Sequence, residues 1–331
     1  MTISYNPPKR KTAYVAAQIP AERRNIDSHD IPRELSSPPS IVRANVPLAG
    51  LTSFRVGGPA QWYAAPRCEA DLLASLAWAK AQELPVTVIG AGSNLLVSDE
   101  GLPGLVIATR NLRQVDYQAQ TGQVIADAGV HMAQLARQVA RRGWSGLEWA
   151  IGIPGTVGGA VVMNAGAHQS CMADSLIDIQ TLTDSGVRQT FTREQLNYGY
   201  RTSILQGTHY TVTQARFQLE VTGDPEQVMA TTNTHLHQRH STQPYYLPSC
   251  GSVFRNPEPQ KAARLIQGTG LKGYKIGDAQ VSELHANFIL NCGSATATDI
   301  FRLIRYVQEK VEQQHSVRLH PEVKILGRFE G

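Results

Sequence analysis

The sequence predicts an α+β fold divided into two or three units, and three observations lead to that prediction. The chain has 331 residues, of which 42% are hydrophobic and 18% charged, so it can bury a substantial core. Amphipathic helical segments and short apolar strand segments both occur along it. Two segments dense in glycine, residues 89–95 and 151–160, interrupt this pattern.

Residues 1–43 are predicted to form a disordered, basic and proline-rich extension. They hold seven lysines and arginines against four acidic residues, or three of the net charge of +4, and have no sustained apolar period. The remaining body is nearly neutral, so no nucleic-acid partner is expected. The chain has no apolar run long enough to span a membrane and no signal-peptide core, so we expect no membrane association and a cytoplasmic location.

The elements follow from the apolar periodicity, and they group into units over residues 44–115, 116–222 and 223–331. The four cysteines stand singly, without CxxC spacing, and are expected to be reduced thiols. We expect helices over residues 71–82, 132–142, 225–238 and 297–314, and strands over 86–89, 104–108 and 322–326, with further β-rich runs before Val221.

The first glycine-rich segment, Gly90–Asn94, follows a predicted strand as a dinucleotide-binding fingerprint would. However, Leu95 stands where that fingerprint has its third glycine, no helix is expected next, and Arg110 and Arg113 replace the acidic residue. A standard NAD-binding domain is therefore not expected. Two interpretations stay open: a turn whose backbone N–H groups hold a phosphate, or an ordinary tight turn.

The second glycine-rich segment carries four glycines within residues 151–160. Glycine in a packed interior costs roughly 0.5–1 kcal/mol relative to alanine, so such a cluster indicates backbone lying close to a large flat ligand or another chain segment. Two such loops, one in each of the first two units, favour a single extended cofactor.

In this order, the motifs resemble those of the UDP-N-acetylenolpyruvoylglucosamine reductase family. The resemblance covers about residues 44–328 and is carried by segments 52–58, 90–94, 153–167, 200–203, 251–257, 277–282 and 320–323. It implies an FAD-binding fold of the vanillyl-alcohol-oxidase (PCMH) type, made of two α+β subdomains over 44–115 and 116–222. A C-terminal α+β substrate domain over 223–331 follows. The short stretch between Tyr200 and Ser252 resembles compact members, which lack a substrate-covering insertion.

The activity implied by the resemblance is NADPH-dependent reduction of UDP-N-acetylglucosamine enolpyruvate to UDP-N-acetylmuramate, a peptidoglycan precursor, through non-covalent FAD. Ser252 matches the family's proton donor, while Arg201 and Glu322 match the residues that bind the substrate carboxylate. An arginine fork suits a carboxylate, and a protonated glutamic acid can donate a hydrogen bond to it. Cys250 is a rival proton donor, because strand alternation would turn it to the same side as Ser252.

The binding residues are assigned by motif position. The residues expected to bind FAD are Arg55, Gly90, Ala91, Gly92, Ser93, Asn94, Gly152, Ile153, Pro154, Gly155, Thr156, Gly158 and Gly159. The residues expected to bind substrate are Tyr200, Arg255, Asn256, Lys272 and His285, and either Tyr245 or Tyr246 would stack on uracil. The chain departs from many compact members at Thr242, where they have a lysine. His235, His237 and His240 scatter around a helix, so no metal site is assigned.

Two alternative functions remain open. The first is an oxidase of the same fold with covalently attached FAD, for which His168 is the nearest candidate attachment residue. The second is a non-catalytic sensor of UDP-sugars, against which the complete set of Ser252, Arg201 and Glu322 argues.

Overall fold

The computed structural model describes residues 38–330, so most of the predicted extension and residue 331 lie outside the described part. The first strand begins at Val42, two residues inside the predicted extension. Helices and strands are both present throughout, as the α+β prediction requires. Within residues 38–330, no helix is long and apolar enough to cross a membrane.

The first unit is a four-stranded mixed sheet with strand order β1-β2-β5-β3. Strands β2 and β3 run parallel to β5, whereas β1 runs antiparallel to β2. The predicted strand over residues 86–89 is confirmed in full, and the predicted helix is confirmed two residues earlier than expected. Its elements are β1 (Val42–Pro47), η1 (Ala49–Leu51), β2 (Pro59–Ala64), α1 (Glu69–Ala81), β3 (Val86–Ile89), β5 (Leu102–Ala108) and η2 (Thr109–Asn111).

The second unit is a five-stranded antiparallel sheet with strand order β12-β11-β13-β7-β6. Its core unites apolar residues of the sheet with those of α2 and α3. The larger elements are β6 (Val115–Gln118), β7 (Gln123–Asp127), α2 (Met132–Ala140), η3 (Glu148–Gly152), α3 (Val157–Val162), β11 (Leu176–Leu182), β12 (Arg188–Thr192) and β13 (Thr211–Gln218). Short elements complete it: β8 (Trp144–Ser145), β9 (Gly166–Ala167), β10 (Ser170–Cys171), α4 (Met172–Ser175) and β14 (Glu220–Val221).

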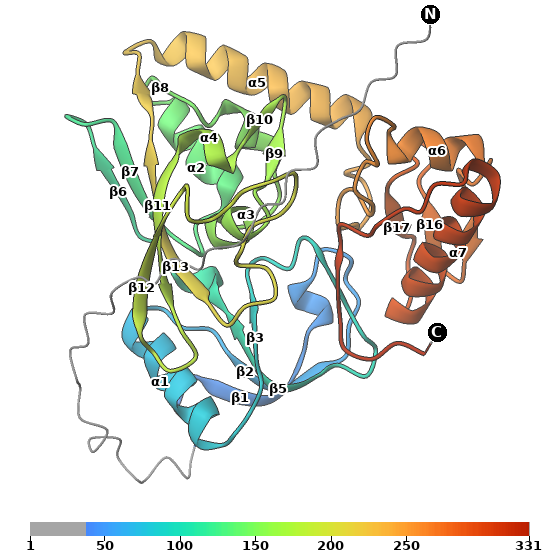
Figure 1. Ribbon diagram of the computed structural model, residues 1–331, viewed down its shortest axis with the longest axis horizontal. Coiled ribbons are helices and arrows are strands. Elements are labelled where there is room, and N and C mark those ends of the chain that lie inside the picture. Colours follow the sequence, from blue (N-terminus) through green and yellow to red (C-terminus); the bar gives the residue numbers. More distant parts are fainter. Residues whose placement is uncertain (1–37, 331) are drawn as a thin grey trace, which may run out of the picture. The chain divides into compact units, whose positions relative to one another are not determined.

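Helix α5 (Pro225–Thr242) extends four residues beyond the predicted helix end at residue 238. Its Asp224 N-cap accepts a hydrogen bond from the Gln227 N–H, and proline occupies the first turn, both of which favour a helix start. The helix was predicted to belong to the C-terminal unit, but it packs against α2, η3 and β8 of the second unit. Figure 1 shows it lying along that unit, because its few apolar residues, such as Leu236, contact the second core.

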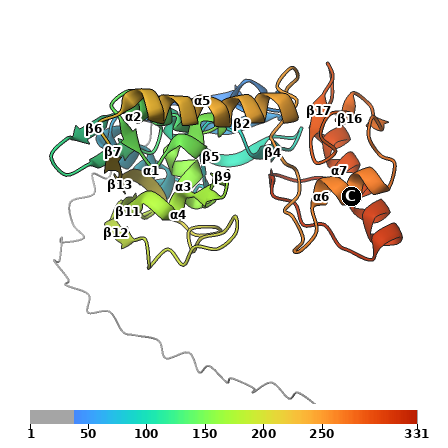
Figure 2. The same ribbon diagram turned by 90° about the horizontal axis from the view of Figure 1, so that it is seen from above.

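The C-terminal unit groups two helices around a three-stranded antiparallel sheet, β15-β16-β17 (Figures 1 and 2). Its elements are α6 (Ala262–Gly268), β15 (Lys275–Ile276), β16 (Ala279–Val281), β17 (Ile289–Asn291) and α7 (Ala297–His315). Apolar residues recur on one side of α7, where Ile300, Leu303, Ile304, Val307 and Val311 are all buried.

Several connections tie the C-terminal unit to the first unit, among them a strand pair and a helix cap. Strand β18 (Lys324–Leu326) leaves its own unit and pairs in parallel with β4 (Leu95–Val97), which directly follows the first glycine-rich turn. In addition, the Asp99 carboxylate accepts hydrogen bonds of 2.8 Å from the N–H groups of Ala297 and Thr298 at the start of α7. The closing strand therefore brings residues near 322 to the glycine-rich turn.

Candidate active site

A large cavity of about 1030 Å³ lies where the two glycine-rich loops meet the C-terminal unit. Every predicted FAD-binding residue except Gly152 lines it, together with Ser252, Arg201 and Glu322. The structure thus brings residues separated by more than 200 positions to one wall. Its size fits an extended cofactor and a substrate better than a single small ligand.

The two glycine-rich loops contact each other at the cavity. The Ser93 hydroxyl donates a hydrogen bond of 3.0 Å to the Pro154 carbonyl. At Gly92 a Cβ atom would lie 2.0 Å from the Leu51 carbonyl oxygen, and at Gly155, with φ +122°, it would lie 2.8 Å from the Ser93 hydroxyl. Glycine is therefore required at Gly92 by the close approach of η1 and at Gly155 by the close approach of the first loop.

The loop residues suit a phosphate-containing cofactor. Buried Thr156 has a hydroxyl oxygen with no hydrogen-bond partner among the described residues, and its residue lines the cavity. Around Gly159 the space is open, since an added Cβ would have its nearest neighbour at 3.8 Å. Arg55 adds a cation at the same wall. An unpaired hydroxyl, exposed backbone and a cation match what an FAD diphosphate needs.

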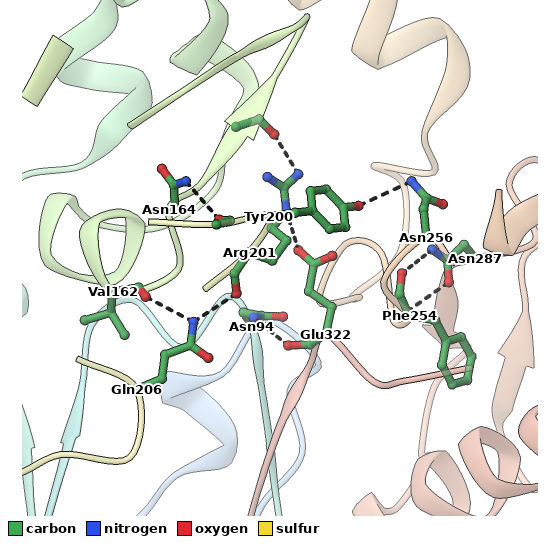
Figure 3. A network of polar contacts seen from close by, with 12 residues as sticks. Asn94, Val162, Asn164, Tyr200, Arg201, Gln206, Phe254, Asn256, Asn287 and Glu322 are labelled. Carbon is green, nitrogen blue, oxygen red and sulfur yellow. Dashed lines mark hydrogen bonds and ion pairs between the residues drawn. The ribbon is translucent and has the colours of Figure 1, made fainter. Parts of the chain in front are cut away.

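Arg201 stands in a tight turn closed by reciprocal backbone hydrogen bonds between Gly199 and Thr202. Its φ of +57° lies in the left-handed region, a conformation that costs a non-glycine residue about 1–3 kcal/mol. The guanidinium offsets this cost with two charge-assisted contacts, 2.9 Å to a Glu322 carboxylate oxygen and 2.7 Å to the Gly166 carbonyl (Figure 3).

The backbone N–H and the backbone carbonyl of Glu322 both form hydrogen bonds that fix its position. Its N–H donates to the Val253 carbonyl at 2.7 Å, and its carbonyl accepts from the Asn94 side-chain amide at 3.1 Å (Figure 3). Burial raises the pKa of the Glu322 carboxyl above its ordinary value, although Arg201 and Arg255 oppose that shift. The carboxyl therefore keeps its proton to a higher pH than a free glutamate does.

Ser252 and Cys250 both line the cavity. The premise of strand alternation between them is wrong, because residues 249–252 form no strand and Gly251 adopts a φ of +81°. Cys250 is only 5% exposed, and burial raises the pKa of its thiol. The Ser252 segment lies beside Glu322, since the Val253 carbonyl binds the Glu322 N–H and Phe254 pairs with Pro321.

Three of the predicted substrate-binding residues lie around the Arg201–Glu322 pair. The Arg201 guanidinium lies 5.2 Å from the Tyr200 ring centre, and the Tyr200 hydroxyl accepts a hydrogen bond of 3.3 Å from Asn256 (Figure 3). Arg255 is near enough to Glu322 to lower its pKa, and its buried Nε has no partner among the described residues. These side chains place further polar groups beside the pair.

None of the five predicted substrate-binding residues lines the cavity itself, and within residues 38–330 Lys272 and His285 also make no contact with the Arg201–Glu322 pair. Burial lowers the pKa of His285, and the nearby Lys272 lowers it further. The His285 ring packs edge-on against Phe288, which does reach the cavity wall. The structure therefore brings these two residues to each other and leaves them one layer behind the cavity.

His168, the candidate for covalent FAD attachment, also lies outside this cavity. Its ring stacks on His235 of α5, with ring centres 4.1 Å apart, and burial lowers its pKa. Stacking on His235 gives His168 a packing role that requires no covalent bond to FAD.

Two polar residues of the site were missed from the sequence. Lys324 lines the cavity two residues after Glu322, and its ammonium donates a hydrogen bond of 2.7 Å to Gln206. The closing strand, predicted over residues 322–326, begins only at Lys324, so Glu322 lies before it and strand alternation does not link the two residues. Gln206, which lies in a loop, is marked by no local signal either. Tyr245 and Tyr246 also line the cavity, 49% and 65% exposed.

Comparisons with known proteins identify the relatives of this chain. Residues 60–192 match the FAD binding domain family, and residues 243–326 match the UDP-N-acetylenolpyruvoylglucosamine reductase, C-terminal domain. The UDP-N-acetylenolpyruvoylglucosamine reductase of Synechococcus elongatus is 58% identical over 285 residues, covering 86% of this chain and 94% of that protein. That of Synechocystis is 53% identical over 293 residues, covering 88% and 92%.

Among solved structures, the UDP-N-acetylenolpyruvylglucosamine reductase of Thermus caldophilus superimposes with a TM-score of 0.75 at 37% identity. The match covers 86% of this chain and all of that one. The fold is therefore an FAD-binding domain of two α+β subdomains with a C-terminal α+β domain. With the glycine-lined cavity and the Arg201–Glu322 pair, these matches show that the chain belongs to the UDP-N-acetylenolpyruvoylglucosamine reductase family.

Proposed function

We propose that this protein reduces UDP-N-acetylglucosamine enolpyruvate to UDP-N-acetylmuramate, using NADPH and non-covalently bound FAD. The observation that carries the proposal is the contact between Arg201 and Glu322 on a wall that also contains Ser252 and both glycine-rich loops. Bound FAD would supply hydride transfer between NADPH and the enolpyruvyl group, with the loops at Gly90–Asn94 and Gly152–Gly159 holding it.

Arg201 and Glu322 are proposed to bind the carboxylate of the enolpyruvyl group. The guanidinium presents parallel N–H donors, and a Glu322 carboxyl that keeps its proton donates a further hydrogen bond. Both interactions strengthen as negative charge spreads from the reacting carbon into the carboxylate, which is how such donors lower a barrier. Arg255, which is close enough to lower the pKa of Glu322, adds positive charge beside this pair.

Ser252 is proposed to donate the proton to the carbon adjacent to the carboxylate. A serine hydroxyl is a weak acid, so it serves only a strongly basic carbon and needs nearby cations to stabilise the oxyanion it leaves. Arg201, Arg255 and Lys324 around Glu322 are candidates for that role. Tyr200 and Asn256 would orient the sugar nearby, while Lys272 and His285 would contact the diphosphate only once substrate is bound.

We further propose a cytoplasmic location and a substrate domain that begins after α5, near residue 243. The packing of α5 on the second unit supports that border, as does the start of the C-terminal family match. The FAD-binding subdomains would then cover residues 44–115 and 116–242.

An anaerobic stopped-flow experiment tests the function directly. NADPH should bleach the flavin absorbance of FAD-loaded protein, and the enolpyruvyl substrate should restore it with release of UDP-N-acetylmuramate. FAD that stays attached after denaturation would indicate the covalent oxidase instead. Bleaching without recovery by the substrate would favour the non-catalytic sensor.

A further inference from the structure

Lys324 is a cation of the cavity lining whose only role in the proposed function is as one of three candidates to stabilise the Ser252 oxyanion. Its ammonium has three donors, and within residues 38–330 it makes one hydrogen bond, 2.7 Å to the Gln206 side-chain oxygen. It forms no ion pair with a carboxylate of the described chain. The remaining donors are therefore available to an occupant of the cavity.

The cavity carries more positive than negative charge. Arg55, Arg201, Arg239 and Lys324 line it, against Asp184 and Glu322. Both carboxylates already have partners, since Asp184 contacts His209 and Glu322 contacts Arg201, each at 2.9 Å. Burial lowers the pKa of the Lys324 ammonium, and the positive charge of Arg255 lowers it further. A partly desolvated ammonium without a counter-ion is stabilised when an anionic group binds beside it.

Lys324 is bonded through its backbone to the first glycine-rich loop, whose residues are expected to hold FAD. Its backbone N–H donates to the carbonyl of Asn94 in the first glycine-rich loop at 3.0 Å. Gln206, which accepts from the ammonium, donates to the Val162 carbonyl at the end of α3 and to the Arg201 carbonyl (Figure 3). The backbone of Lys324 is thus bonded to the first glycine-rich loop, and its side chain is linked through Gln206 to the end of α3.

We propose that Lys324 stabilises negative charge on the isoalloxazine ring of bound FAD, and that Gln206 positions its ammonium for this task. The ring gains negative charge when it accepts a hydride, which brings two electrons and one proton. A fixed cation beside the ring favours that state by Coulomb attraction. The inference rests on FAD occupying this cavity, as the proposed function requires.

The test measures the flavin itself, without substrate. Sulfite forms a bond to flavin N5 with its lone pair and leaves negative charge on the ring, so its affinity reports a nearby cation. We expect Lys324→Met to weaken sulfite binding about tenfold or more. The reduction potential of bound FAD should fall in parallel, by about 30 mV for each tenfold change in a two-electron equilibrium.

Three further variants separate charge from packing. Lys324→Arg keeps the cation and should retain most of the sulfite affinity, whereas Gln206→Met should lose a smaller part of it. Lys80→Met, at the exposed end of α1, removes one charge that does not line the cavity and should change nothing. Lys324→Gln replaces the methionine variant if the latter loses FAD.

Unchanged sulfite affinity and potential in Lys324→Met, with a raised KM for the enolpyruvyl substrate, would overturn the inference and assign Lys324 to substrate binding. The proposed function would survive that result. A wild-type protein that binds no FAD would overturn both proposals.

Discussion

Two groups of residues were assigned to the same site by motif position, yet the structure treats them differently. Arg201, Ser252 and Glu322 converge on the cavity wall from loops of different units, and two of them are in contact. Lys272 and His285 do not line that cavity, and the His285 ring packs against Phe288, which does. A sequence motif thus identifies residues of the family's site. Only the structure shows which of them line the cavity where the reacting atoms would lie.

The largest effect is expected for Ser252→Ala. Removal of the proton donor should slow oxidation of reduced FAD by the enolpyruvyl substrate by about 10²- to 10⁴-fold, the range typical of general acids. Reduction of FAD by NADPH should stay nearly unchanged in rapid-mixing measurements. Cys250→Ala is the matched control, and a comparable loss in that variant would transfer the donor role to the thiol.

Arg201→Lys should follow, with a loss of about 10²-fold in the substrate half-reaction. Lysine keeps the charge but lacks the planar fork that contacts both Glu322 and Gly166. Steady-state kinetics should show a lower kcat as well as a higher KM. A variant with wild-type kcat would mean that Arg201 serves binding alone.

Glu322 should give the site its pH dependence. Because the pKa of the carboxyl is raised above its ordinary 4.5, the protonated donor is present below the raised pKa and is lost as pH rises through it. The rate of substrate reduction should therefore fall over the pH range in which this carboxyl loses its proton, which forms the alkaline limb of the pH profile. Glu322→Gln, a donor at every pH, should remove that limb at a cost of about tenfold in rate, with Glu322→Ala slower still. An identical pH profile in Glu322→Gln would assign the limb to another group.

The smallest effects are expected for Lys272 and His285, which do not line the cavity. Lys272→Ala and His285→Ala should raise the KM for the UDP-linked substrate a few fold and leave kcat within about twofold, as expected of binding that is equal in ground and transition states. A loss in kcat comparable to that of Arg201→Lys would show that substrate binding draws this loop into the cavity.

Local pattern was sufficient for many elements of the fold. The strand at Val86–Ile89 and the helix at Ala297–His315 follow from apolar periodicity and a capping threonine, which are local properties. The place of α5 was not predictable in this way. Its sequence is mostly polar, so only the contact of a residue such as Leu236 with the second core reveals the unit it joins.

The site, like the fold, was predictable from the sequence only in part. The glycine clusters indicated a large cofactor, and the resemblance named Ser252, Arg201 and Glu322. Neither could show that Arg201 adopts a left-handed conformation or that Gln206 bridges Lys324 and the Arg201 carbonyl. The Arg201 turn is closed locally by Gly199 and Thr202. However, the contacts that give it a role, from Lys324 to Gln206 and from Arg201 to Glu322, join residues more than 100 positions apart, which a single sequence does not encode as a local pattern.

A crystal structure of Ser252→Ala with FAD and the enolpyruvyl substrate tests the central claim most directly. We expect the substrate carboxylate within hydrogen-bond distance, about 2.7–3.1 Å, of both Arg201 and Glu322, with the flavin between the two glycine-rich loops. A carboxylate bound beside Lys272 and His285, away from the Arg201–Glu322 pair, would contradict it.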